Sequence, residues 1–376
     1  MNTVRKLRTH KRRAALWITL AVAVLLALGL AAVAIANPFT TNDMNTPLTA
    51  TQVAQELVGP GVTISNAKFT GAPVAAGTFS GGSGIIGFDK GIILSTGNIA
   101  DVKGPNDSGS KTTVNNAAGD TALDVLAGGT TYDAAALEFD VTTKGKTLFF
   151  SYVFASEEYN NYVGSKYNDV FAFWLNGVNY ATVGSPAKPV SINTINDGTN
   201  GDGVGATHPE LFVNNDYGTA ASTLNTQMDG LTKTLTFIAP IKPNTSTHLK
   251  LAIADTGDSS YDSVVFIKAD SLATDSKRPT PLVKALTVKR NKVGKIQYEV
   301  KDPLPSSGKA KVTLNILNRS GKVVKSLKLG LQVVNKWLKY PYKFSMAKGK
   351  YLFNIYATDL AGNKQTKIGK AVLKVN

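Results

Sequence analysis

Cysteine is absent from this sequence, so no disulfide, thiolate metal site or cysteine nucleophile can form. Histidine is scarce, since only His208 and His248 follow the first 36 residues. Neither a G-x-S-x-G nor an H-E-x-x-H motif occurs. These absences exclude cysteine chemistry and leave the sequence without the motifs of the common serine hydrolases and zinc proteases.

Acidic residues are scarce at both ends of the chain. Residues 1–36 contain 6 Lys and Arg and no acid, residues 37–277 contain 13 basic and 23 acidic residues, and residues 278–376 contain 22 and 3. The positive charge is therefore confined to the ends, and an export segment comes first. For this reason we do not expect nucleic acid as a partner, although the isoelectric point is near 9.6.

Residues 1–36 have the plan of an export signal. A basic stretch from Arg5 to Arg13 precedes an uncharged stretch over 14–36, and Ala34 and Ala36 are the small residues that a signal peptidase recognises. As an apolar helix rising ~1.5 Å per residue, 14–36 could also span the ~30 Å hydrocarbon layer if it is not cleaved. The sequence predicts either a cleaved signal peptide or an N-terminal membrane anchor, and both place the rest outside the cytoplasm.

The sequence up to residue 273 predicts a mainly β domain. After a polar leader over 37–47, a short helix is expected over 48–57, ended by Gly59-Pro60-Gly61. From there, short β-type runs alternate with glycine-rich turns. We expect residues 48–273 to form a two-sheet β-sandwich or jelly roll.

A boundary is predicted at 274–281, where Asp-Ser-Lys-Arg-Pro-Thr-Pro interrupts the strand pattern and the charge changes sign. Residues 311–318 alternate in polarity, a turn follows at 319–322, and 323–327 return as a hairpin partner. Residues 282–376 are therefore expected to form a basic immunoglobulin-like sandwich.

One stretch, residues 148–177, combines structure with candidate chemistry. Two aromatic, β-branched runs enclose the polar segment that contains Glu157, Glu158 and Asp169, the pattern of two strands joined by a shaped loop. We expect alternate residues of the second run, Phe171 and Phe173, to lie in the core.

Residues of about 44 to 273 resemble the choice-of-anchor L domain of bacterial surface proteins. The resemblance rests on several stretches in order: 61–66, 91–97, 154–159, 168–173, 190–193, Met228-Asp229-Gly230, 253–255 and 262–266. It implies an exported domain held at the cell by an anchor that varies between proteins and is usually C-terminal. This sequence ends Leu373-Lys374-Val375-Asn376 without a sorting motif, so we expect attachment through the N-terminal segment or the basic C-terminal domain. The latter resembles, more loosely, immunoglobulin-like domains of the flagellar hook-capping type.

Carboxylates gather in two stretches that the fold would bring together if their strands are neighbours. They are Glu157, Glu158 and Asp169 in the first, and Asp255, Asp258 and Asp262 in the second. Ca²⁺ takes six to eight oxygens at about 2.3–2.6 Å, which two such loops could supply. Alternatively, these side chains cap their own turns or are simply solvated.

Binding is expected rather than catalysis. Glu157 and Glu158 are adjacent on an extended segment and point to opposite faces, so they cannot flank one glycosidic bond. Tyr159 and Tyr162 are candidate ligand contacts. The expected function is adhesion to envelope polymers, surface glycans or proteins, with Ca²⁺ as a possible stabilising ion. The alternative is a secreted polysaccharide-active hydrolase.

Overall fold

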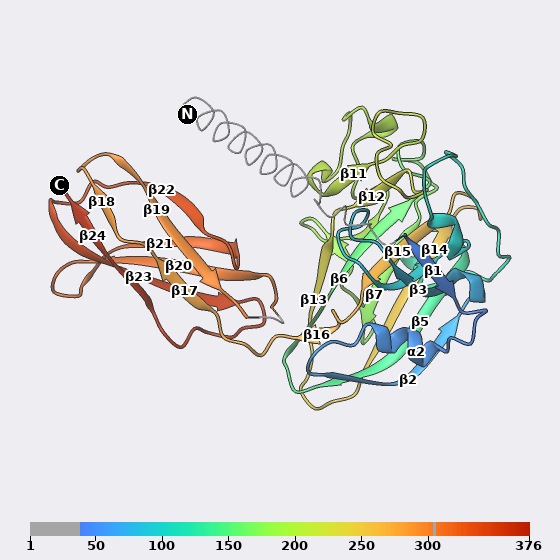
Figure 1. Cartoon of the computed structure of the whole chain (residues 1–376), viewed down its shortest axis with the longest axis horizontal. Helices are drawn as coiled ribbons and strands as arrows, with labels where there is room; N and C mark the ends of the chain where they lie inside the picture. The colour runs from blue at the N-terminus through green and yellow to red at the C-terminus, as the bar shows by residue number, and fades with distance from the viewer. Residues whose placement is uncertain (1–37, 304–305) are drawn as a thin grey trace, which may run out of the picture. The chain divides into compact units, whose positions relative to one another are not determined.

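The structure, a computed structural model, describes residues 38–303 and 306–376 (Figure 1). The predicted signal peptide or apolar helix, with Ala34 and Ala36, lies outside these residues. In the part that is described, no helix is both long and apolar enough to cross a membrane.

Residues 40–274, here called the N-terminal module, contain two large sheets. The first sheet consists, in spatial order, of β1 (Thr40–Asp43), β3 (Ala76–Ser80), β4 (Gly91–Ser95), β15 (Ser263–Lys268), β6 (Thr147–Ser156), β12 (Gly230–Thr232) and β11 (Phe212–Asn214), with β13 (Leu235–Pro240) and β16 (Ala273–Thr274) also paired to β6. The second consists of β2 (Val62–Thr70), β5 (Thr131–Thr143), β14 (Thr247–Thr256), β7 (Val170–Leu175), β10 (Lys188–Ser191) and β9 (Thr182–Val183), with β8 (Val178–Asn179) on β7. Mainly β structure, as predicted, is confirmed.

The main core lies between these two sheets. Phe150 of β6 and Phe237 of β13 belong to the first sheet, Phe173 of β7 belongs to the second, and all three are buried in one cluster. The Phe173 ring centroid lies 4.4 Å from that of Phe150 and 3.8 Å from that of Phe237. Alternation along β7 therefore directs Phe171 and Phe173 into the core, as expected, while Trp174 packs in a separate cluster on the other face.

Two short helices pack against the sheets. The predicted helix is present as α2 (Ala50–Glu56), which begins with a capping box formed by Thr49 and Gln52. A second helix, α3 (Thr121–Ala127), was not expected from the sequence; Asp120 caps its first turn, and Leu123 packs on β7 and β14. The 3₁₀ turns are η1 (Pro73–Ala75), η2 (Ile99–Val102), η3 (Thr199–Gly201) and η4 (Pro209–Leu211).

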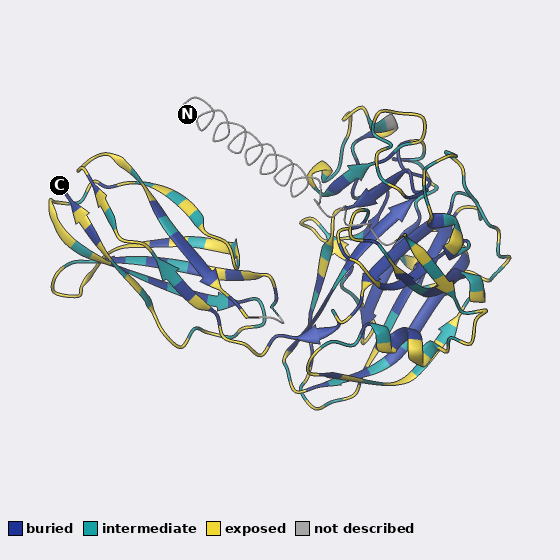
Figure 2. Cartoon of the chain, in the orientation of Figure 1, coloured by how far each residue is buried: buried dark blue, intermediate teal, exposed yellow. Residues whose placement is uncertain are grey.

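Residues 275–376, here called the C-terminal module, form two smaller sheets around their own core. One sheet contains β17 (Thr280–Val283), β19 (Val293–Lys301) and β22 (Leu338–Lys343), and the other contains β18 (Leu286–Val288), β24 (Gly369–Val375), β23 (Gly349–Asp359), β20 (Lys309–Leu317) and β21 (Val323–Val333). The predicted hairpin is β20–β21. Figure 2 shows buried and exposed residues alternating along these strands, which is the pattern of a sandwich with one buried face per sheet.

Candidate metal centre

Two of the predicted carboxylates meet at one end of the first sheet. Strands β6 and β15 pair antiparallel with Ser156 opposite Ser263, so Glu157 and Asp262 are the next residues beyond that pair. The Glu157 N–H donates to the Asp262 carbonyl at 3.1 Å. Each residue therefore lies where its strand leaves the sheet.

The second sheet brings two more carboxylates together in the same way. Strands β7 and β14 pair with Val170 opposite Ala254, and Asp169 and Asp255 adjoin that pair. Asp169 Oδ1 accepts from the Thr256 N–H at 2.9 Å, and Glu158 Oε2 accepts from the Asp169 N–H at 3.3 Å. Because Glu158 follows Glu157, its contact with Asp169 joins the carboxylates of the two sheets into one group.

Asp229 completes this acidic cluster, which comprises Glu157, Glu158, Asp169, Asp229, Asp255 and Asp262. It immediately precedes β12, which pairs with β6 on the side opposite β15, with Gly230 facing Ser156. Asp229 was not among the predicted ligands, although it lies in the Met228-Asp229-Gly230 stretch that contributed to the family resemblance.

The acidic cluster is buried. None of its six residues is more than 3% exposed. The predicted ligand Asp258 differs: it is exposed, and its Oδ1 accepts from the Ser260 N–H at 3.0 Å, closing its own turn. Asp258 therefore lies at the rim of the cluster rather than inside it.

A loop over residues 103–118 covers the cluster and donates backbone N–H groups to it. The Lys111 N–H donates to Glu157 Oε2 at 3.1 Å, and the Thr113 N–H donates to Asp262 Oδ2 at 2.9 Å. The Lys111 ammonium group pairs instead with Asp101 at 3.7 Å. Within residues 38–303 and 306–376, no Lys, Arg or His forms an ion pair with any of the six.

Many oxygens of the cluster have no hydrogen-bond partner among the described residues. These buried carboxylate atoms are Glu157 Oε1, Asp169 Oδ2, Asp229 Oδ2, both Asp255 oxygens and Asp262 Oδ1, and the hydroxyls of Thr256 and Ser263 are in the same condition. A buried carboxylate without a partner costs several kcal/mol. The donor set, entirely oxygen, is the one that a hard cation prefers.

Burial and mutual repulsion raise the pKa values of these carboxyl groups. Burial, with the nearby Asp229 and Asp262 charges, raises the pKa of Glu157 to about 9, and burial raises that of Asp262 to about 8. Burial also raises the pKa of Asp255, with the Asp169 charge adding to it. Without a cation, these groups resist ionisation at neutral pH.

The acidic cluster is more open than a single closed coordination sphere. Among the described residues, the one group of carboxylates that places one oxygen from each residue within 4.8 Å of the others is elsewhere, formed by Asp275, Asp302 and Asp359. An ion in the N-terminal module would draw oxygens from its several loops.

The two predicted ligand-contacting tyrosines have different environments. Tyr159 is fully buried between Phe154 and Phe212, with ring centroids at 6.3 and 4.8 Å, so the expectation that it contacts a ligand at the surface is wrong. Tyr162 is half-buried. Its ring lies 5.5 Å from that of Tyr167 and 5.0 Å from that of Tyr261, so three tyrosines gather beside the cluster.

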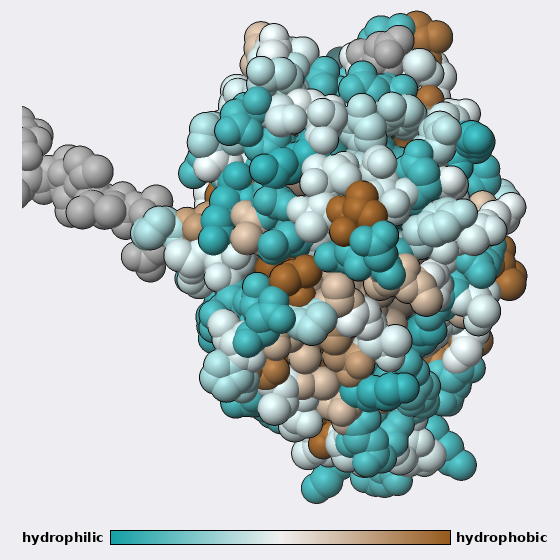
Figure 3. Space-filling model, turned by 90° about the vertical axis from the view of Figure 1, so that its right-hand side faces the viewer, coloured by the Kyte–Doolittle hydropathy of each residue, from teal (hydrophilic) through white to brown (hydrophobic). Residues whose placement is uncertain are grey.

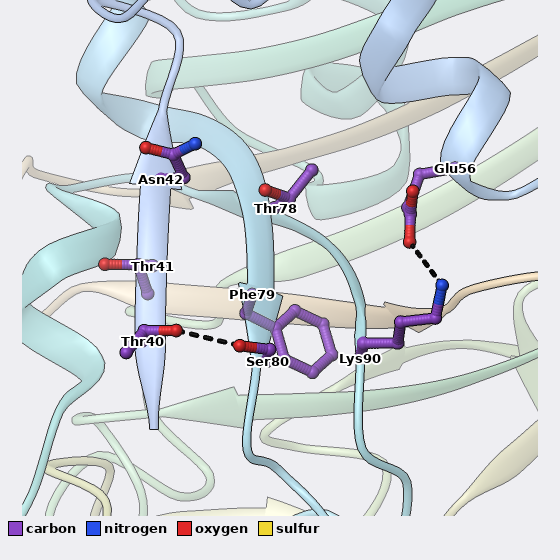
Figure 4. A pocket seen from close by; sticks show the side chains of 8 residues that line it. All are labelled: Thr40, Thr41, Asn42, Glu56, Thr78, Phe79, Ser80 and Lys90. Atoms are coloured by element: carbon purple, nitrogen blue, oxygen red, sulfur yellow. Dashed lines mark hydrogen bonds and ion pairs between the residues drawn. The ribbon is translucent and has the colours of Figure 1, made fainter. Parts of the chain in front are cut away.

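A separate polar cavity of ≈430 Å³ lies at the β1 edge of the first sheet (Figure 4). Thr40 and Ser80 share a hydrogen bond of 2.8 Å at its wall, and Lys90 pairs with Glu56 at 3.2 Å. Glu56 is the one carboxylate among its lining residues. The cavity offers hydroxyl and amide groups to a polar ligand.

The fold and the acidic cluster define a mainly β protein with carboxylates concentrated where strands from two facing sheets end. The chain belongs to the choice-of-anchor L family, whose model matches residues 40–273. Membership indicates a bacterial surface or exported protein. No curated protein sequence matches the chain.

Solved structures resemble parts of the chain only distantly. The CARDB domain of a Pyrococcus furiosus protein, in complex with di-metal ions, is 19% identical over 28% of this chain and 95% of that one, with a TM-score of 0.20. The extracellular domain of a one component system from B. thetaiotaomicron is 13% identical over 33% and 18%, with a TM-score of 0.20. The Endo-D glycoside hydrolase domain from Streptococcus pneumoniae R6 is 11% identical over 82% and 37%, with a TM-score of 0.21. Structural similarities this weak do not support an inference about function.

Proposed function

We propose that this chain is a non-catalytic adhesion or binding protein of the bacterial cell surface whose N-terminal module binds Ca²⁺ in the acidic cluster. The observation that carries the calcium assignment is the set of buried carboxylate oxygens that lack partners, on Glu157, Asp169, Asp229, Asp255 and Asp262. A divalent cation would neutralise charges that burial otherwise opposes, and it would join loops from both sheets.

The tyrosines beside the cluster are the proposed ligand-binding surface. The Tyr162 N–H donates to the Glu158 carbonyl at 3.0 Å, and Tyr261 immediately precedes Asp262. An ion held by Glu158 and Asp262 would therefore fix the backbone that carries Tyr162 and Tyr261. Aromatic rings flanked by polar groups suit stacking on a surface glycan.

The face of the molecule in Figure 3 is largely polar, with apolar residues gathered mainly near its middle. The choice of surface glycans and envelope polymers as partners rests on the tyrosines beside the acidic cluster.

Attachment to the cell is proposed to involve the basic C-terminal module or the N-terminal segment. Residues 278–376 contain 22 Lys and Arg against 3 acids. Anionic envelope polymers would attract such a surface, and salt would weaken that attraction. Extraction of intact cells with salt should release the protein if charge holds it, whereas release only by detergent would indicate the N-terminal segment.

Neither the acidic cluster nor the polar cavity presents an accessible pair of carboxylates for the hydrolase alternative. Glycoside hydrolysis uses two carboxyl groups on either side of the scissile bond. Glu157 and Glu158 are buried, and Glu56 in the polar cavity is paired with Lys90. Turnover of chromogenic glycosides by the purified protein would contradict the proposal, whereas glycan binding without turnover would support it.

Calorimetric titration of Ca²⁺ into chelator-treated protein tests the metal assignment directly. Binding heat and a higher Tm with the ion are expected for the wild type. Asp255→Asn should weaken both effects, because Asp255 contributes two unpartnered oxygens. Asp270→Asn is the matched control, since that side chain is 72% exposed and outside the cluster. An absence of both heat and Tm shift in the wild type would remove calcium from the proposal.

A further inference from the structure

A second group of carboxylates lies in the C-terminal module. Asp275 follows β16, Asp302 follows β19, and Asp359 ends β23. One oxygen from each lies within 4.8 Å of the others, and none of the three residues is more than 5% exposed. Three segments separated in sequence thus place their carboxylates at one buried point, here called the Asp275 trio.

Asp302 provides an independent indication of a missing ligand. Its Oδ2 accepts from the Ser306 hydroxyl at 2.6 Å, but its Oδ1 is buried and has no hydrogen-bond partner among the described residues. The residue is 2% exposed, so water does not compensate freely. An unpartnered carboxylate oxygen beside two other carboxylates is the arrangement that a bound cation satisfies.

The remaining oxygens of the trio accept from neutral groups. Asp275 Oδ2 accepts from the N–H and the hydroxyl of Ser307, both at 3.0 Å. Asp359 Oδ1 and Oδ2 accept from the N–H and the side-chain amide of Asn363 at 2.7 and 3.0 Å. These bonds orient the carboxylates but leave their negative charges uncompensated.

The charge distribution of the C-terminal module distinguishes the Asp275 trio from an ordinary group of ion-paired acids. Residues 278–376 contain three acids, Glu299, Asp302 and Asp359, and two of them belong to the trio. The same residues contain 22 Lys and Arg, yet among the described residues none forms an ion pair with Asp275, Asp302 or Asp359. With cationic side chains so abundant, carboxylates gathered away from them fit an inorganic cation better than a salt bridge.

We infer that Asp275, Asp302 and Asp359 bind a divalent hard cation, Ca²⁺ in the extracellular medium, which ties the segment entering the C-terminal module to the ends of β19 and β23. The ligands are all oxygen, which excludes a preference for soft metals. The hydroxyls of Ser306 and Ser307, which are hydrogen-bonded to Asp302 and Asp275, are neutral oxygen groups within reach of the trio. The site is separate from the acidic cluster, so either site can fail without the other.

The segment held by Asp275 contains a protease site that can report on the ion. The Lys277 N–H donates to Asp275 Oδ1 at 3.0 Å, and Lys277 and Arg278 are exposed. Trypsin can cleave after Lys277, whereas Pro279 protects the bond after Arg278. Cleavage requires the segment to leave its ordered conformation, so a cation that holds Asp275 should slow it.

Limited trypsinolysis of the full chain, with or without about 2 mM Ca²⁺, tests the inference. Mass spectrometry would follow the fragment that begins at Arg278. Calcium should slow its appearance at least about fivefold in the wild type. Asp302→Asn and Asp359→Asn should each abolish most of this protection and reduce the calorimetric stoichiometry by one ion.

Glu299→Gln is the matched control, because Glu299 is the third acid of residues 278–376, is 8% exposed and lies outside the trio. It should retain calcium protection after Lys277. Circular dichroism of each variant would identify loss of folding, and Asp359→Asn substitutes for Asp302→Asn if the latter does not fold. Equal cleavage after Lys277 with and without Ca²⁺ in the wild type would overturn the inference, even if the acidic cluster binds calcium.

Discussion

The backbone of Gly97 lies directly against the carboxylate of Asp262, and a Cβ at position 97 would overlap that carboxylate. Gly97 follows β4, which pairs with β15 on the side opposite β6, and its N–H donates to the Ser95 hydroxyl at 3.1 Å. The glycine is therefore required by the position of an acidic-cluster residue rather than by a turn.

Gly97→Ala should displace Asp262 and weaken both folding and calcium binding. Forcing a methyl group into this space is expected to lower the free energy of unfolding by about 1–3 kcal/mol. Denaturant unfolding and calcium calorimetry would measure the two effects. Gly129→Ala is the control, because its added Cβ meets open space. Equal stability and calcium affinity in both variants would contradict the contact.

The chelator-treated protein should become less stable as pH rises. Burial raises the pKa of Glu157 to about 9 and that of Asp262 to about 8, above the values of the unfolded chain. The folded state therefore retains protons that the unfolded state has already released. The resulting stabilisation is complete below the pKa values of the unfolded chain and is lost as the pH rises through the pKa values of the folded state. The Tm should fall by at least about 2–4 °C between about pH 6 and pH 8, since each kcal/mol corresponds to such a shift. Saturating Ca²⁺ should remove this decline, and a Tm that rises with pH in chelator would contradict it.

Replacement of the tyrosines should separate binding from folding. Tyr162→Ala and Tyr261→Ala are expected to weaken glycan binding at least about fivefold, because each stacked ring contributes on the order of 1 kcal/mol. Their melting temperatures with Ca²⁺ should change little compared with their binding. Trp337→Ala removes an aromatic residue that is 42% exposed in the C-terminal module and serves as the control. Unchanged glycan binding in both tyrosine variants would place the binding surface elsewhere.

Phe237 should be among the most important residues for stability of the N-terminal module. It is 1% exposed and packs on Phe150 and Phe173 between the two sheets. Phe237→Ala is expected to lower the free energy of unfolding by about 3–5 kcal/mol. Val125→Ala, at a side chain that is 82% exposed, should change it by less than about 0.5 kcal/mol. Chemical denaturation would compare the two, and similar losses would contradict the assignment of the core.

Local pattern in the sequence identified five of the six residues of the acidic cluster. Glu157 and Asp169 flank the loop between two recognisable strands, and Asp255 and Asp262 flank another. What joins the loops is the pairing of β6 with β15 and of β7 with β14, which alternation along single strands does not specify. Asp229 was missed for the same reason, since its short strand β12 has too few residues to show a period.

Tyr159 shows how a loop can reverse an expectation based on polarity. It lies in an acidic, asparagine-rich segment that looks exposed in sequence. In the structure Asn160 adopts φ of +67°, and the segment turns so that Tyr159 enters the core beside Phe154 and Phe212. Backbone conformations of this kind are accessible to Asn, but the sequence does not specify where they are used.

The Asp275 trio could not be found by inspecting neighbours along the chain. Asp275 lies in a predicted linker, and Asp302 and Asp359 lie 57 residues apart within a predominantly basic region. Only the sandwich brings the end of β19 to the end of β23. The unusual scarcity of acids in residues 278–376 was the one available signal.

The acidic cluster draws its six residues from three connections that close only when both sheets of the N-terminal module have assembled. An unfolded chain therefore holds no preformed site, and binding of the proposed ion would be coupled to folding. For an exported protein that binds Ca²⁺ as proposed, this coupling would make maturation depend on the ionic composition of the compartment it enters. The ions outside the cell would then determine when the N-terminal module completes its folding.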